Sequence, residues 1–249
     1  MNQIHPRDKT ISEIEQHKKI ALSKIEALID NYISNDKNKA DKFNYWLEDY
    51  AKFLEYENKF NPKSLRKYKR GEIIKAHLGY NIGSEEGGLH YCVVIDKNNH
   101  LSSPVITVIP LTSLKPSRDV SKLRNGELYI GNELYENVQN KINLLMLETQ
   151  KKFSGIEQIS YNKENIKELR NNINDASDSV KRLDIIDRLS KEAAKMKSGS
   201  IALVGQIKTI SKIRIYDPKT NDDVLSKIKL SSETLDKIDD EIKNLFLKN

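Results

Sequence analysis

The sequence predicts an α+β protein in which a small antiparallel sheet or barrel is combined with several amphipathic helices. Between residues 71 and 130, short runs rich in Val and Ile are bounded by Gly, Pro and Asn, a pattern typical of short strands joined by turns. Before and after this region, apolar residues recur every three or four positions, as on one face of a helix. A chain of 249 residues can form one large domain or two smaller ones.

Residues 1–60 are predicted to form an N-terminal extension of two helices. Thr10 and Glu13 have the spacing of a capping box, which marks the start of a helix. The apolar stripe of the first helix consists of Ala21, Leu22, Ile25, Leu28, Ile29 and Tyr32. That of the second consists of Phe43, Trp46, Leu47, Tyr50, Phe53 and Leu54. Aromatic residues at helical spacing favour packing over base stacking.

Residues 133–197 are predicted to form an antiparallel helical hairpin that interrupts the sheet region, which spans residues 61–249. The apolar residues of the first arm are Val138, Ile142 and Leu145, and those of the second are Ile166, Leu169, Ile173, Ala176, Val180 and Leu183. Ser160, Tyr161 and Asn162 form the expected turn. Glu127 to Ile130 is a further strand candidate, and Ser231 to Leu247 a final helix.

Charge and composition favour an anionic partner and exclude several other classes of protein. The 42 Lys and Arg exceed the 36 Asp and Glu by six. Residues 59–75 hold seven cations and one acid, and residues 200–215 add Lys208, Lys212 and Arg214 with no acid. Such clusters suit a phosphate backbone, although a solvated basic face is a fair alternative for the first.

The sequence carries no zinc-ligand spacing, no phosphate-binding loop and no GxSxG elbow, so no metal or cofactor is expected. The polar start MNQIHPRDKT is unlike a signal peptide, and no apolar run approaches the ~20 residues of a membrane span. We therefore expect a cytoplasmic protein with no membrane partner. Its single cysteine, Cys92, is expected to pack in the core.

The decamer GSEEGGLHYC, residues 83–92, is the most distinctive segment. Gly87 and Gly88 can relax the backbone and offer NH groups to an anion, although two glycines alone also suit a plain turn. His90 follows at the threshold of a strand and can exchange a proton near neutral pH. Together these residues predict a site that holds a ligand.

Two blocks of the sequence resemble the MazF/PemK family of toxins. The first is RGEIIKAHLGYNIGSEEGGLHYCVVIDKN followed by SPVITVIPLT, which is similar to the family pattern RGD(I/V), GSEQGG-x-RP-x-VVI and SPT. The second is SIALVGQIKTISKIRI, residues 200–215, which is similar to the family's S-V-x-L-x-EQIRTIDK-x-RL. The resemblance covers about residues 69–112 and 200–215, with the final helix as a further match. More than half of the chain lies outside the two blocks.

This resemblance implies an SH3-like barrel of the MazF/PemK/CcdB kind and a metal-independent endoribonuclease. Attack of the 2′-hydroxyl would cleave single-stranded RNA to leave a 2′,3′-cyclic phosphate and a 5′-hydroxyl. The resemblance also implies a homodimer and a cognate antitoxin that covers the groove. A different expectation is a catalytically silent module of the same fold that binds nucleic acid or a protein target such as gyrase.

The resemblance also assigns site residues. The family's catalytic arginine falls on His90, the following proline on Tyr91 and the catalytic threonine on Thr112. Histidine is the better proton shuttle but lacks the bidentate grip of arginine on phosphate. Glu85 is expected to accept the 2′-hydroxyl proton or to orient His90. The residues expected to contact RNA or phosphate are Arg70, Ser84, Gly87, Gly88, Gln206, Lys208 and Lys212.

The two appendages have no counterpart in the family pattern. The N-terminal helices are expected to pack on the hairpin, to cover the groove or to extend a dimer interface.

Overall fold

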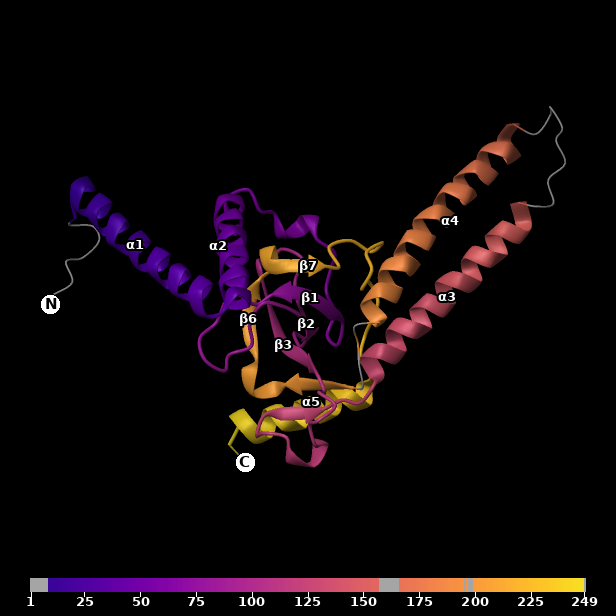
Figure 1. Ribbon diagram of the computed structural model, residues 1–249. Coiled ribbons are helices and arrows are strands. Elements are labelled where there is room, and N and C mark those ends of the chain that lie inside the picture. The colour runs from indigo at the N-terminus through magenta and orange to yellow at the C-terminus, as the bar shows by residue number, and fades with distance from the viewer. Residues whose placement is uncertain (1–8, 157–165, 195, 197–198, 249) are drawn as a thin grey trace. The chain divides into compact units, whose positions relative to one another are not determined.

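The computed structural model describes residues 9–156, 166–194, 196 and 199–248. The chain divides into two compact units, Met1–Asn58 and Lys59–Asn249 (Figure 1).

The first unit is a pair of helices, as predicted. They are α1 (Ile11–Asn35) and α2 (Lys37–Glu57). The predicted capping box is present, since the Glu13 amide donates to the Thr10 hydroxyl at 3.3 Å and the Glu13 carboxylate accepts from the Thr10 amide at 2.7 Å. Asp36 ends α1 and caps α2 by accepting from the Lys39 amide. The ring of Tyr32 packs edge-on against Phe43, with 6.2 Å between the ring centroids.

The second unit is built on a seven-stranded sheet in which every pair is antiparallel. Its strands are β1 (Ile73–His77), β2 (Leu89–Val94), β3 (Val105–Ser113), β4 (Glu127–Tyr129), β5 (Ser200–Leu203), β6 (Lys208–Ser211) and β7 (Ile215–Asp217). The order is β4-β5-β3-β2-β1-β7, and β6 also pairs with β3. The predicted α+β class is confirmed. Within the described residues β4 and β7 do not pair with each other, so the sheet is not closed.

Strand β3 organises the sheet because it has two partners on one edge. Its first half, from Val105 to Val108, pairs with β6, whereas its last three residues pair with β5. A short 3₁₀ turn, η4 (Val204–Gln206), joins β5 to β6. The turn η5 (Lys212–Arg214) then leads into β7.

Alternating residues of the strands bury two faces, as the pleat of a strand requires. One face, with Ile73, Val93 and Ile109, belongs to a core that also takes in residues of the helical hairpin and the last helix. The other face, with Ile74 and Val94, packs around the buried Tyr68. Cys92 is fully buried on this second face, which confirms its predicted place in the core.

The hairpin consists of α3 (Glu133–Ile156) and α4 (Ile166–Ala193), inserted between β4 and β5 as predicted. Its predicted turn at Ser160–Asn162 lies outside the described residues. The base of the hairpin is anchored by buried apolar residues, namely Leu134, Val138, Ile142, Ile186, Leu189 and Ala193. The predicted final helix is α5 (Ser232–Phe246), capped by the hydroxyl of Ser231. No helix in the described ranges has the length and apolar character needed to cross a membrane.

Candidate active site

The site is built on the loop that joins β1 to β2. Backbone bonds close this loop, because the Gly88 amide donates to the Gly79 carbonyl at 2.6 Å and the Leu78 amide to the Gly88 carbonyl at 2.7 Å. Gly88 has a φ of +80°, which side chains other than glycine rarely adopt. A Cβ on Gly87 would lie 2.7 Å from the Gly79 oxygen. Both glycines are therefore needed for the loop to close in this way.

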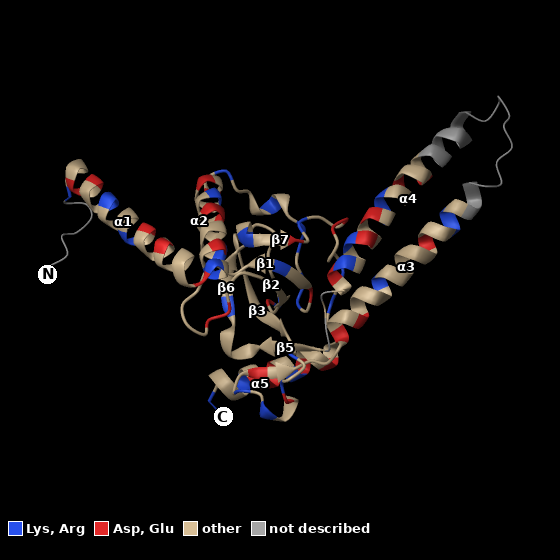
Figure 2. Cartoon of the chain, in the orientation of Figure 1, with Lys and Arg blue, Asp and Glu red and all other residues tan. Residues whose placement is uncertain are grey.

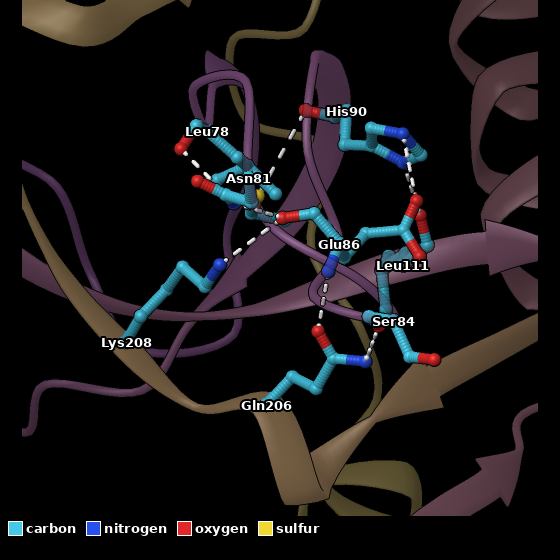
Figure 3. Close-up of polar contacts among 9 residues, drawn as sticks. Leu78, Asn81, Ser84, Glu86, His90, Leu111, Gln206 and Lys208 are labelled. Atoms are coloured by element: carbon cyan, nitrogen blue, oxygen red, sulfur yellow. Dashed lines mark hydrogen bonds and ion pairs between the residues drawn. The ribbon is translucent and has the colours of Figure 1, made fainter.

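Glu86 is the residue through which the loop is fixed to the rest of the sheet. Its carbonyl accepts from the Asn81 amide group at 2.6 Å and from the Lys208 ammonium at 3.1 Å. Its own amide donates to the side-chain oxygen of Gln206 at 2.6 Å, and the nitrogen of that side chain donates to the Ser84 carbonyl at 3.1 Å (Figure 3). The second sequence block thus supports the loop of the first.

The carboxylate of Glu86 pairs with His90. Glu86 Oε1 lies 2.9 Å from His90 Nε2, while His90 Nδ1 lies 3.3 Å from the Leu111 carbonyl (Figure 3). A carbonyl can only accept, so Nδ1 carries a proton, and the carboxylate favours a second proton on Nε2. This geometry stabilises an imidazolium.

The charges of this pair reinforce each other. Burial lowers the pKa of His90, but the hydrogen bond and charge of Glu86, together with backbone hydrogen bonds to Leu111 and Gly87, raise the pKa above its usual value. The hydrogen bond from His90 in turn lowers the pKa of the Glu86 carboxyl, against the effect of burial. At neutral pH the pair is thus biased toward the ionised form of both groups.

Thr112 lies on the strand beside His90. Strands β2 and β3 pair Tyr91 with Leu111, and Thr112 directly follows Leu111, whose carbonyl lies 3.3 Å from His90 Nδ1. Thr112 itself pairs with Ile201 of β5 and is partly exposed. The site therefore draws on the loop, β2, β3 and the start of β6.

A hollow of about 400 Å³ lies beside the loop. It is lined by Ser84, Glu85, Gly205, Gln206, Ile207 and Lys208. Five of the predicted site residues therefore lie at the loop, in two separate places. Ser84, Glu85, Gln206 and Lys208 line the hollow, while His90 pairs with Glu86.

Two predicted phosphate ligands lie elsewhere. The guanidinium of Arg70 donates to the Ile95 carbonyl and pairs with Asp239 of α5. Lys212 is 1% exposed, and its ammonium donates to the His100 carbonyl at 3.0 Å. Burial lowers the pKa of Lys212. Because Gly71 pairs with Val94 and the Lys212 amide with Pro104, both cations lie at the end of the sheet opposite the loop.

Sequence reasoning missed Glu86 and Asn81. Glu85 and Glu86 are adjacent and chemically alike, so the sequence alone did not show which one faces His90. The turn at Gly87 and Gly88 brings Glu86 back against His90. Among the described residues, no group of three or more His, Cys, Asp and Glu is placed to hold a metal ion.

Residues 69–152 match the model of the family described as PemK-like, MazF-like toxin of type II toxin-antitoxin system. The matched segment holds the closed loop, Glu86, His90 and Thr112, and it ends within α3. The resemblance predicted from the first sequence block is thereby confirmed, and this segment is similar to MazF/PemK-like toxins. Toxins of this family are endoribonucleases. No curated protein matches the chain.

Proposed function

We propose that the protein is a toxin-type, metal-independent endoribonuclease that cleaves single-stranded RNA by attack of the 2′-hydroxyl on the adjacent phosphate. The observation that carries this proposal is the Glu86–His90 pair, 2.9 Å apart, on a glycine-closed loop inside the family-matched segment. A carboxylate beside an imidazolium supplies the base and the acid that this reaction needs. The SH3-like barrel implied by the resemblance is part of this proposal.

In the proposed reaction Glu86 accepts the proton of the 2′-hydroxyl as the bond from O2′ to phosphorus forms. His90 donates its Nε2 proton to the 5′-oxygen as the bond from phosphorus to that oxygen breaks. The products are a 2′,3′-cyclic phosphate and a 5′-hydroxyl. When His90 turns from Glu86 to the leaving oxygen, Glu86 loses the hydrogen bond that lowers its pKa and becomes a stronger base.

Negative charge that develops on the phosphate needs donors near the loop. Lys208 is suited to this role because its ammonium already lies 3.1 Å from the Glu86 carbonyl. The amide of Gly87 and the hydroxyl of Thr112 are further candidates. Arg70 and Lys212 are not assigned this role, because both lie at the end of the sheet opposite the loop.

The test is cleavage of a defined single-stranded RNA by the pure protein in EDTA, with the product ends mapped. His90→Ala should lower the rate about 10²- to 10⁴-fold, which is the usual contribution of general acid–base catalysis. His100→Ala is the matched control, since His100 is exposed and bonds to Ser102 in a different loop. Absence of cleavage by wild type, or undiminished cleavage by His90→Ala, would contradict the mechanism.

A silent binding module is the second candidate. It is favoured by one observation, namely that both ring nitrogens of His90 already have partners in Glu86 and Leu111. In that case the protein binds RNA, or a protein target such as gyrase, without turnover. Salt-dependent RNA binding with no product ends after long incubation would support this candidate.

A cognate antitoxin and a homodimer complete the proposal. The antitoxin is supported by the family description, which names a toxin-antitoxin system, and the homodimer is implied by the sequence resemblance. Light scattering of the purified chain measures directly whether it is a homodimer.

A further inference from the structure

The edge strand β7 connects the loop end of the sheet to the opposite end. At its start, Arg214 donates to the Leu78 carbonyl, which directly precedes the loop. The strand then pairs along β1, with Ile215 opposite Ala76 and Asp217 opposite Lys75 (Figure 1). Beyond β7, the Lys219 carbonyl accepts from the Arg66 amide at 2.9 Å. A ligand that follows β7 therefore travels from the active loop to the far end of β1.

Tyr216 presents an aromatic ring halfway along this path. Its neighbour Ile215 points into the core, whereas Tyr216 is 65% exposed. Tyr216 also lines a cavity of about 220 Å³ together with the cations Lys75, Arg188 and Lys191 and the acids Glu192 and Asp217. Lys75 pairs with Glu192 at 2.8 Å, so the cations left beside the ring are Arg188 and Lys191. Arg188 and Lys191 pair with acids of their own helix in exposed positions, and such pairs are weak enough to exchange for a phosphate. An exposed ring beside cations suits the stacking of a nucleic-acid base.

A basic patch lies where this path ends. It consists of five exposed lysines, Lys67, Lys69, Lys219, Lys227 and Lys229. None of them has a carboxylate partner in the part of the chain that the structure describes. Lys and Arg on the loops next to β7 are blue in Figure 2. The lysines are held at one end of the sheet by backbone contacts, since Lys219 binds Arg66 and Lys229 bridges to Glu72.

The acids near this patch do not neutralise it. The Glu72 carboxylate forms an ion pair with the Arg66 guanidinium at 2.8 Å. Asp223 accepts the backbone amides of Lys219 and Thr220 at 2.6 and 2.8 Å. Asp222 is the exposed acid of the same loop. Glu148 lines the same hollow as Lys227 and Lys229 but pairs with Arg182. The patch therefore keeps a net positive charge.

We propose that β7 and this patch form a second contact surface for single-stranded RNA, continuous with the cleavage loop. Tyr216 stacks on a base, and the five lysines contact phosphates beyond it. This inference rests on the proposed function, because it names where the rest of the substrate lies. Cations interleaved with an exposed aromatic ring fit a polynucleotide better than an acidic protein, which offers no bases to stack.

The test measures binding of 2′-O-methyl RNA, which has no 2′-hydroxyl to attack, in lengths of 6 and 20 nucleotides. The long probe should bind more tightly than the short one. The triple variant K67Q/K219Q/K227Q should remove most of this difference and reduce the slope of log affinity against log salt by about 2, at ~0.7 per lost phosphate contact. Tyr216→Ala should weaken the long probe roughly tenfold, whereas Tyr216→Phe keeps the ring and should change little.

The matched control is K122Q/K237Q/K243Q, which removes the same charge from exposed lysines that each pair with an acid three or four residues away. Equal loss of affinity in both triples, or no preference for the long probe, would overturn the proposal. So would a patch triple that loses affinity for polyglutamate but not for RNA, which would assign the patch to an acidic protein. Binding does not require turnover, so failure of the nuclease hypothesis in the cleavage assay is a separate result.

Discussion

The two ends of the β1–β2 hairpin both carry charged pairs, but they use them differently. At the loop end, the side chains of His90 and Glu86 keep 25% and 24% of their surface exposed. At the opposite end, Arg66 and Glu72 form an ion pair in which each side chain is 7% exposed. Arg70 and Lys212 at that end bind carbonyls and an acid of the protein itself. These two cations therefore stabilise the fold at a distance from the loop, whereas Lys208 lies at the loop itself.

The comparison also shows that the cations of one basic stretch of sequence have different roles. Residues 59–75 hold seven cations, of which Arg66 and Arg70 form ion pairs within the fold at the end of the sheet opposite the loop, whereas Lys67 and Lys69 are exposed. By contrast, Lys208 reaches the loop although it is more than a hundred residues away in sequence. Position in the sheet decides the role of each cation.

The largest expected effect is a loss of stability from a substitution at the end of the sheet opposite the loop. Arg66→Met leaves Glu72 buried without its partner, which should lower the free energy of unfolding by about 3–5 kcal/mol. Urea denaturation measures the change, and RNA cleavage per folded molecule should stay the same. Lys122→Met is the control, because its pair with Asp119 is exposed and its loss should cost less than about 1 kcal/mol. A loss of catalysis in folded Arg66→Met would show that the end of the sheet opposite the loop also contributes to the reaction.

At the loop end the expected effect is on catalysis. Glu86→Gln keeps the shape of the side chain but removes the base, so kcat should fall about 10²-fold with little change in stability. Glu85→Gln is the matched control, because Glu85 lines the hollow but is not the carboxylate that pairs with His90. Its kcat should stay within about threefold of wild type. If Glu85→Gln lowered kcat more than Glu86→Gln, Glu85 would be the base.

The smallest effect is the pH dependence of stability from the same pair. The raised pKa of His90 contributes stability that is complete below its unfolded value of about 6.5 and is lost as pH rises through the folded pKa. The lowered pKa of Glu86 contributes stability present above its unfolded value of about 4.3 and lost as pH falls through the folded pKa. Wild type should therefore exceed His90→Gln most in mildly acidic solution.

Because a quarter of each side chain is exposed, the difference should be about 1 kcal/mol or less. Urea unfolding of both proteins between about pH 3 and 9 measures it. An advantage of wild type that grows above neutral pH would mean that His90 is neutral in the folded protein.

Much of the fold could be predicted because its signals are local. The capping box of Thr10 and Glu13, the periodicity of α3 and α4, and the glycines of the loop act over a few residues. The sequence could not show which glutamate pairs with His90. Glu85 and Glu86 are chemically alike, and only the turn of the folded chain decides which carboxylate faces His90. The places of Arg70 and Lys212 depend on strand register, which links residues far apart in sequence. The open sheet was likewise not predictable, because its edge strands β4 and β7 are only three residues each.

The loop that carries Glu86 and His90 is held in place by Gln206 and Lys208, which lie 120 and 122 residues from their partners on it. During synthesis, Glu86 and His90 leave the ribosome long before these supports exist. The whole hairpin insertion must be made first. An unfinished chain therefore carries the reactive pair without the contacts that position it, and the site is assembled only as the last fifth of the protein is completed.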